Sequence, residues 1–282
     1  MKNIRIIPRL DIKGPNLVKG IHLEGLRVLG TPEAFARYYY ENGADELIFQ
    51  DVVASLYDRN SLHDIISRTA KDIFIPLTVG GGLRNIDDIK QVLRAGADKV
   101  SLNTAAIRNP DFIKQASLKF GSSTIVVAIE AIKQTNGRYF AFVDNGREET
   151  GIEVLAWAQQ AEELGAGEIL ITSVDKEGTG DGYDLELISI ISDGVNIPVI
   201  AHGGASNMEN LMNAVTTGHA DALAIASMFH YHIAEKLNVE REAKAEGNMS
   251  FLKSGKNFSI IETSNIDEVK KFFKQNGISC RS

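Results

Sequence analysis

The chain has 282 residues, of which 44% are hydrophobic and 24% are charged, and its formal net charge is −7. This is the composition of a globular protein, and no apolar run approaches the roughly 20 residues that span a bilayer. The negative charge argues against a nucleic-acid partner bound through its phosphates. It still allows a local basic site for a small phosphorylated molecule.

A single cysteine, Cys280, excludes an intramolecular disulfide and a metal cluster built on cysteines. The N-terminal segment is interrupted by Pro8, and it lacks the apolar core and small-residue cleavage site of a signal peptide. We therefore expect a cytoplasmic protein. We also expect a single domain over residues 1–282, because α/β barrels of this length commonly form one domain.

Short apolar, β-branched runs alternate along the chain with longer segments of helical period. The predicted strands cover residues 4–11, 46–51, 75–79, 99–102, 125–130, 168–172, 199–201 and 222–226. The predicted helices cover residues 32–42, 61–71, 86–94, 110–120, 152–164, 185–192, 208–217 and 265–275. This alternation predicts parallel strands joined by helices.

The two halves of the chain repeat each other. The turn at residues 43–46 recurs 122 residues later at 165–168, and the glycine-rich segment 75–85 recurs at the same offset at 197–207. Each half therefore holds four βα units. Two such halves close most simply as a (β/α)8 TIM barrel with internal twofold character, while an open doubly wound sheet is the competing layout.

The C-terminal part departs from this repeat. Residues 230–263 separate the last predicted strand from the last predicted helix, which makes them an insertion on the face where barrel active sites lie. Within the insertion, residues 236–246 have the pattern of an extra helix and residues 250–263 that of a loop or short hairpin. A surface excursion without a role in function is the alternative.

Two acidic residues end corresponding strands of the two halves. Asp11 ends the first strand and Glu130 ends the fifth, so the two carboxylates should face each other across the mouth of the barrel. Such a pair suits general acid and general base catalysis. Alternatively, each carboxylate caps a loop or pairs with a lysine such as Lys13 or Lys133.

Glycine-rich strand ends form a second paired signal. Gly80 to Gly82 lie at the end of one predicted strand, and Asn103 and Thr104 lie at the end of the next. In the second half, Gly203 and Gly204 lie at the end of a predicted strand, and Ala226 and Ser227 lie at the end of the next. Bare backbone N–H groups near helix N-termini bind anions. The duplication predicts two phosphate sites and a substrate with a phosphate at each end, whereas plain turn geometry is the alternative for each glycine.

Histidines give no convincing metal site. His202 lies beside a glycine pair without other histidines or cysteines nearby, and His230 and His232 have no third ligand at suitable spacing. We predict neither a metal nor a cofactor.

These residues together resemble the HisF family, the cyclase subunit of imidazole glycerol phosphate synthase. The matching stretches are residues 5–8, 11, 17–20, 43–46, 74–82, 96–100, 165–170, 178–179 and 182–186. The resemblance implies an enzyme that uses ammonia to convert a bisphosphorylated ribulosyl-aminoimidazole carboxamide to imidazole glycerol phosphate in histidine biosynthesis. It also implies a heterodimer in which a HisH-type glutaminase, docked on the N-terminal barrel face, supplies the ammonia.

Carried over residue by residue, the resemblance makes Asp11 and Glu130 catalytic and Lys19 the lysine of a mobile first loop that closes over the substrate. We hypothesise that Asp11 is the acid and Glu130 the base, with swapped roles as the alternative. Contacts to the substrate and its phosphates are implied for Asp51, Gly82, Asn103, Thr104, Thr172, Glu177, Gly178, Gly204, Ala226 and Ser227.

The resemblance also implies a gate for ammonia. Four charged residues match the family's gate: Arg5, Glu46, Lys99 and Glu168. They lie at strand starts, so their side chains can converge as an ionic ring at the bottom of the barrel. Ordinary stabilising salt bridges are the alternative, although a buried ionic ring is costly to keep for stability alone. Asp98 matches a position at the partner interface.

The sequence departs from the family near the active-site face. Glu130 and Glu177 each stand where the family has Asp, Arg9 replaces a small residue, and His202 replaces Ser. These changes leave two alternatives open. One is a HisF-like paralogue that delivers ammonia for an acetamidino group on a surface-polysaccharide sugar, and the other is a non-catalytic phosphate-binding scaffold for a glutaminase.

Overall fold

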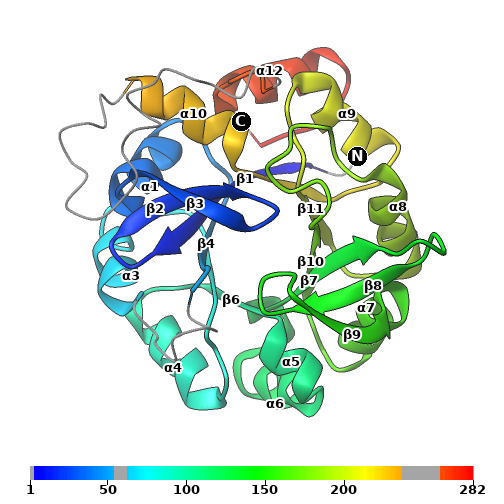
Figure 1. The fold of residues 1–282 in the computed structure, drawn as a ribbon. Helices are drawn as coiled ribbons and strands as arrows, with labels where there is room; N and C mark the ends of the chain where they lie inside the picture. Colours follow the sequence, from blue (N-terminus) through cyan, green and yellow to red (C-terminus); the bar gives the residue numbers. More distant parts are fainter. Residues whose placement is uncertain (1–2, 54–61, 237–260, 282) are drawn as a thin grey trace.

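The computed structural model describes residues 3–53, 62–236 and 261–281, and within these ranges eight parallel strands form a closed ring (Figure 1). The ring closes because β1 pairs with β12 on one side and β4 on the other, while β7 pairs with β10. In ring order the strands are β1 (Arg5–Lys13), β4 (Leu47–Asp51), β5 (Leu77–Gly80), β6 (Lys99–Leu102), β7 (Ile125–Lys133), β10 (Glu168–Ser173), β11 (Val199–His202) and β12 (Ala222–Ile225). The predicted (β/α)8 barrel is confirmed.

Helices surround the ring on its outer side (Figure 1). They are α1 (Pro32–Glu41), α3 (His63–Thr69), α4 (Ile86–Ala95), α5 (Thr104–Arg108), α6 (Asp111–Phe120), α7 (Val154–Glu163), α8 (Leu185–Gly194), α9 (Met208–Thr216), α10 (Ser227–Lys236) and α12 (Ile266–Gln275), with a 3-10 turn at Ser122–Thr124. Each predicted helix is present with shifted ends, while the short α5 was not predicted. None of the helices in the described ranges is long and apolar enough to cross a membrane.

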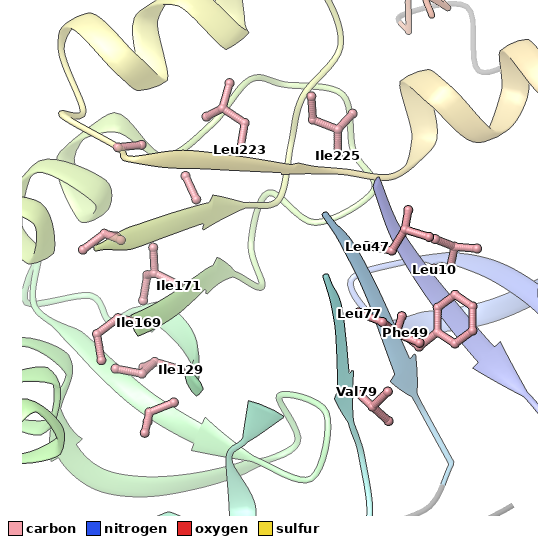
Figure 2. Packing of buried hydrophobic residues seen from close by; sticks show 14 of the residues in the cluster. Leu10, Leu47, Phe49, Leu77, Val79, Ile129, Ile169, Ile171, Leu223 and Ile225 are labelled. Atoms are coloured by element: carbon pink, nitrogen blue, oxygen red, sulfur yellow. The ribbon is translucent and has the colours of Figure 1, made fainter. Parts of the chain in front are cut away.

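Side chains of the strands alternate between two apolar layers. Residues that point outward, such as Phe49 and Ile171, pack under the helices (Figure 2). Residues that point inward fill the middle of the barrel, and they are Ile7, Ile48, Val126, Leu170, Ile200, Ala222 and Ala224. Because both faces of each strand are buried, the strands appear in the sequence as nearly continuous apolar runs.

The internal repeat has a structural basis in shared turn chemistry. Asn85 and Asn207, which lie 122 residues apart, each begin a helix by accepting N–H groups of the first turn with the side-chain oxygen. At the opposite face, Asp45, Asp98 and Asp221 precede strands and each accepts the backbone N–H of the preceding barrel strand at 2.7–2.9 Å. The repeated sequence therefore encodes the same strand-to-strand connections twice.

Two antiparallel hairpins on the mouth side of the barrel were missed by the sequence analysis. Strands β2 (Asn16–Ile21) and β3 (Glu24–Gly30) follow β1, and strands β8 (Tyr139–Val143) and β9 (Glu148–Glu153) follow β7. Each hairpin continues the first strand of one half, so the twofold character extends to the mouth (blue and green in Figure 1).

The C-terminal part is docked by α12. Its Lys270 donates to Asp45 and to the carbonyl of Gly43, both at 2.7 Å, which ties this helix to the bottom of the barrel. Residues 230–236 of the predicted insertion continue helix α10 directly from β12. The predicted helix over 236–246 and the loop over 250–263 fall almost entirely in residues 237–260, outside the described ranges, and the insertion remains a prediction.

Candidate active site

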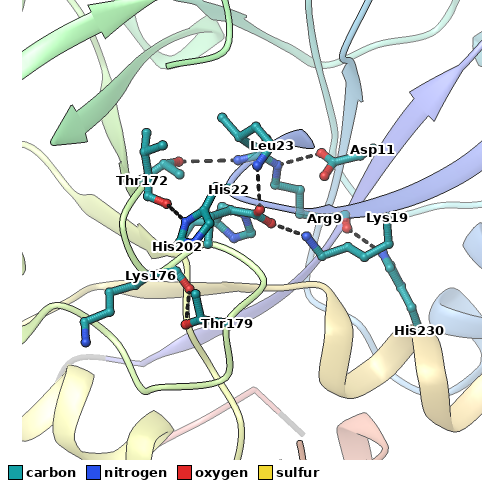
Figure 3. A network of polar contacts seen from close by, with 12 residues as sticks. Arg9, Asp11, Lys19, His22, Leu23, Thr172, Lys176, Thr179, His202 and His230 are labelled. Atoms are coloured by element: carbon teal, nitrogen blue, oxygen red, sulfur yellow. Dashed lines mark hydrogen bonds and ion pairs between the residues drawn. The ribbon is translucent and has the colours of Figure 1, made fainter. Parts of the chain in front are cut away.

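Strand β1 carries a series of inward-pointing residues from the bottom of the barrel to its mouth. Arg5 lies at the bottom, Ile7 in the apolar middle, Arg9 above it and Asp11 at the rim, as the two-residue period of a strand requires. The buried Arg9 guanidinium donates from Nε to Asp11 Oδ1 at 3.0 Å and from Nη1 to Thr172 Oγ1 at 3.3 Å (Figure 3). Since Thr172 lies on β10, three strands around the ring from β1, this side chain crosses the barrel interior.

The Asp11 carboxylate is buried but surrounded by positive charge. Burial acts to raise its pKa, but the charges of Arg9 and Lys19 and the hydrogen bond from Arg9 outweigh burial and hold the pKa below the ordinary value. Asp11 is therefore ionised at neutral pH. A buried carboxylate in this state can accept a proton.

Glu130 ends the inward-facing series of β7, and its environment has the opposite effect. Burial raises the pKa of this carboxyl to about 7, and the negative charges of Asp144 and Asp11 act in the same direction. A backbone N–H of Gly146, in the β8–β9 turn, donates to Glu130 Oε2 at 2.8 Å and opposes the shift in part. Near pH 7 a large fraction of Glu130 is protonated, so this group can donate a proton.

A cavity of about 390 Å³ opens on the Glu130 side of the mouth. This volume falls within the range of small-molecule sites. The predicted residues that line it are Asp51, Gly82, Asn103, Thr104, Glu130 and Thr172, together with Arg9. The structure thus brings the first predicted phosphate loop and one of the two predicted catalytic carboxylates to a single cavity.

Further lining residues of this large cavity were not predicted, and they are Arg84, Arg108, Asp144 and Asn145. Arg108 pairs with Asp144 at 2.9 Å, and Asn145 Nδ2 donates to the carbonyl of Val52 at 2.6 Å. With Arg9, three guanidinium groups lie at the cavity, a group suited to an anionic ligand, and Arg108 also pairs with Glu148 at 3.2 Å. The signal of Arg84 and Arg108 in the sequence is weak, because they lie in a loop and a short helix whose positions depend on the closed barrel.

The second predicted phosphate loop lines a much smaller cavity of about 20 Å³. Its walls include Lys19, Glu177, Gly178, His202, Gly204, Ala226 and Ser227. Gly204 is required here, because its φ is +98° and a Cβ would lie 2.1 Å from the carbonyl oxygen of Gly182. The predicted residues do come together here, and the two cavities differ in size.

The small cavity is restricted because the β2–β3 hairpin is closed over it. The Lys19 ammonium pairs with Glu177, and both side chains are buried. Glu177 also accepts the backbone N–H of Leu23 at 3.0 Å on its carboxylate and that of His22 at 2.8 Å on its carbonyl (Figure 3). Asp11, Thr172 and Lys19 of the first loop are all buried at the mouth, and Glu177 in the loop after β10 pairs with Lys19.

The turn of this hairpin has an unfavourable backbone. His22 and Leu23 both have positive φ, at 51° and 62°, in a two-residue turn where Asn and Gly are preferred. Such a backbone conformation is kept only where contacts with the surrounding structure enforce it. The contacts from Glu177 and a 2.8 Å contact between His22 Nδ1 and the carbonyl of Val174 supply this constraint.

The four predicted gate residues form an alternating ionic ring at the bottom of the barrel. Arg5 Nη1 contacts Glu46 at 2.7 Å and Glu168 at 3.0 Å, and Lys99 Nζ contacts the same two carboxylates at 3.0 Å each. Burial opposes the charge of Arg5, but the two carboxylates outweigh it and raise the pKa of this guanidinium. Beside the ring, Asp98 is exposed at the same face.

No group of three or more His, Cys, Asp or Glu side chains in the described ranges is arranged to hold a metal ion. At the mouth, Glu130 lines the large cavity, whereas the buried Asp11 lines neither of the two cavities.

Comparison with known proteins assigns this arrangement to a family. A family model described as "Histidine biosynthesis protein" matches residues 5–235. The imidazole glycerol phosphate synthase subunit HisF of Legionella pneumophila is 57% identical over 209 residues, which cover 74% of this chain and 99% of that protein. The chain belongs to the HisF family. The HisF subunits of Alkaliphilus metalliredigens and Trichormus variabilis are 47% identical over 228 residues and 46% identical over 250 residues.

The HisF assignment agrees with the resemblance inferred from the sequence motifs. It makes the chain an enzyme of the cyclase type. The alignments cover 81% of this chain and 90% of the Alkaliphilus protein, and 86% of this chain and 97% of the Trichormus protein. The family model, over residues 5–235, spans all eight strands of the barrel ring.

Proposed function

We propose that this HisF protein is the cyclase subunit of imidazole glycerol phosphate synthase. It uses ammonia to convert a bisphosphorylated ribulosyl-aminoimidazole carboxamide to imidazole glycerol phosphate. The observation that carries the proposal is the pair of carboxyl groups at the mouth, because Asp11 is held ionised by Arg9 while burial raises the pKa of Glu130 to about 7. An ionised and a protonated carboxyl group can act as base and acid on one bound substrate.

In this proposal Asp11 is the general base and Glu130 the general acid. Asp11 accepts a proton as ammonia adds to the substrate and the ring closes. Glu130 donates a proton to the leaving aminoimidazole portion. This assignment reverses the roles hypothesised first from the sequence and adopts the alternative, since the pKa of Asp11 lies below and that of Glu130 above the ordinary carboxyl value.

The two glycine-rich loops bind the two substrate phosphates in this proposal. One phosphate occupies the large cavity with Gly82, Asn103 and Thr104, where Arg84 and Arg108 supply positive charge. The other enters the small cavity at Gly204 and Ser227, where Lys19 is the nearest cation. Because Lys19 is paired with Glu177, the second phosphate must displace this carboxylate before the site can fill.

Ammonia enters at the opposite face in this proposal. A HisH-type glutaminase binds around the ionic ring, with Asp98 at the contact, and releases ammonia into the barrel. The apolar middle layer between the ring and the mouth favours neutral ammonia over ammonium, because an unpaired charge is costly to bury. Identities of 46–57% to HisF subunits favour the histidine reaction over the amidinating paralogue.

The test is direct turnover by the isolated chain. With the bisphosphorylated substrate and an ammonium salt, we expect formation of imidazole glycerol phosphate at a rate that follows the concentration of free ammonia. Asp11→Asn and Glu130→Gln should each lower the rate about 10²- to 10⁴-fold, the usual effect of losing a positioned acid or base. Binding of the substrate without turnover by the unaltered chain would contradict the proposal.

A further inference from the structure

His202 carries an unused hydrogen-bonding atom beside the small cavity. It ends β11 with its side chain toward the barrel interior, next to the inward-facing Ile200. The residue is 4% exposed, and its Nδ1 lies 3.1 Å from the carbonyl oxygen of Ala224. Its Nε2 is buried and has no hydrogen-bond partner among the described residues.

The contact with Ala224 fixes the tautomer of the ring. A carbonyl oxygen can only accept, so Nδ1 carries the hydrogen and Nε2 presents a lone pair. The ring lines the small cavity together with Gly203, Gly204 and Ser227. A buried lone pair in a cavity built for an anion repels that anion unless it first binds a proton.

Charges on three neighbouring segments surround this ring. Arg9 and Asp11 face it from β1, Lys19 from β2 and Glu177 from the loop after β10, while Ala224 of β12 and Ser227 of α10 are neutral. Burial, together with Arg9 and Lys19, lowers the pKa of His202 well below the ordinary value, and Asp11 opposes this shift. In the empty site the ring is therefore neutral.

An incoming phosphate reverses this balance. The cavity has room for about one water-sized group in its present form, so the anion must separate Lys19 from Glu177 to enter. It then brings up to two negative charges to a site whose single lysine was already neutralised by a carboxylate. The bare Nε2 of His202 is the group placed to compensate by binding a proton.

We propose that His202 takes up a proton from solvent when a phosphate ester binds in the small cavity, and that the new Nε2–H donates to a phosphate oxygen. This proposal rests on the proposed function, because it deepens the second phosphate site of that reaction. Binding of the anion is then coupled to the uptake of one proton. Between the pKa values of His202 in the free and bound states, affinity falls by up to about tenfold for each unit of increasing pH.

The coupling can be measured with sulfate, a dianion that does not itself titrate between pH 6 and 8. Long-range ¹H–¹⁵N spectra of the full-length chain report the protonation of histidine side chains, and His202→Ser identifies the His202 signals. We expect sulfate to move the His202 ring nitrogens from neutral to imidazolium positions at pH 7. In the same titration, the amide signals of Gly203, Gly204 and Ser227 should shift.

Two substitutions separate this role from its alternatives. His202→Ser should bind sulfate at the small cavity with an affinity that no longer changes between pH 6 and 8. Glu177→Gln tests whether Glu177 takes the proton instead, and this variant should keep the His202 protonation. A shift of the three amides while the His202 ring stays neutral would overturn the role of His202 and leave the phosphate site intact. Absence of any amide shift would overturn both.

Discussion

At the scale of single residues, Arg9 contributes to the difference between Asp11 and Glu130, the two carboxyl groups proposed to be catalytic. It is the nearest cation to Asp11, and its charge also lowers the pKa of Glu130 against the larger effect of burial. Arg9 lowers the pKa of Asp11 more, because of the two carboxyl groups only Asp11 accepts a hydrogen bond from the guanidinium. One buried cation thus leaves one carboxyl group ionised and the other close to its titration point near neutral pH.

Removal of Arg9 should therefore change the pH dependence of turnover. Without it, burial is opposed mainly by Lys19, and the pKa of Asp11 should rise. Activity that needs ionised Asp11 is lost as pH falls through this pKa, so the acidic limb of kcat/KM should move to higher pH in Arg9→Met. Arg9→Lys keeps the charge and should restore most of the original profile. An unchanged acidic limb in Arg9→Met would refute this role.

At the scale of elements, the two mouth hairpins differ in how they are held. The β8–β9 turn positions Glu130 through Gly146, whereas the β2–β3 hairpin is fixed across the mouth by Glu177. Glu177 reaches Lys19 and the backbone of the strained turn together. Its carboxylate thus stabilises the closed hairpin.

Loss of this carboxylate should release the hairpin. Glu177→Gln leaves Lys19 buried without its counter-charge, at a cost of about 3–5 kcal/mol if the hairpin were to stay closed. We expect faster hydrogen exchange at the amides of His22 and Leu23 and across β2 and β3. Glu149→Gln, which removes an exposed carboxylate on β9, is the matched control and should leave their exchange unchanged. Equal protection in both variants would contradict the role of Glu177.

The same elements show what the sequence could predict. Barrel strands and helices were predictable because burial on both strand faces and amphipathic helices leave period-specific patterns. The hairpins were missed because β3 and β9 are partly exposed and lack a continuous apolar run, and their signals were confined to turn residues such as Asn145 and Gly146. The pair of Lys19 and Glu177 joins residues 158 positions apart and depends on closure of the mouth, which no local pattern encodes.

At the scale of the whole molecule, the ionic ring closes the bottom of the barrel. Its side chains come from or immediately precede β1, β4, β6 and β10, so both halves contribute. The ring side chains are 9–23% exposed, whereas Arg37 and Asp72 in a surface pair are 57% and 47% exposed. Shielding from water makes each ring charge more dependent on its partners.

The ring should therefore contribute more to stability than surface pairs do. Glu46→Gln leaves Arg5 and Lys99 without one shared carboxylate and should lower the free energy of unfolding by about 3 kcal/mol. Asp72→Asn, which breaks the surface pair with Arg37, should lower it by much less. Urea denaturation of the two variants makes the comparison. Equal losses would show that the ring is no more than an ordinary set of surface contacts.

The central claim is that Asp11 and Glu130 hold opposite protonation states in one mouth. A pH titration followed by the ¹³C signals of their carboxyl carbons tests it most directly, with Asp11→Asn and Glu130→Gln to assign the signals. We predict that Glu130 titrates near pH 7 and that Asp11 titrates below the ordinary range of an aspartate. Titration of both groups together between about pH 4 and 5, the range of unperturbed carboxyl groups, would contradict the account.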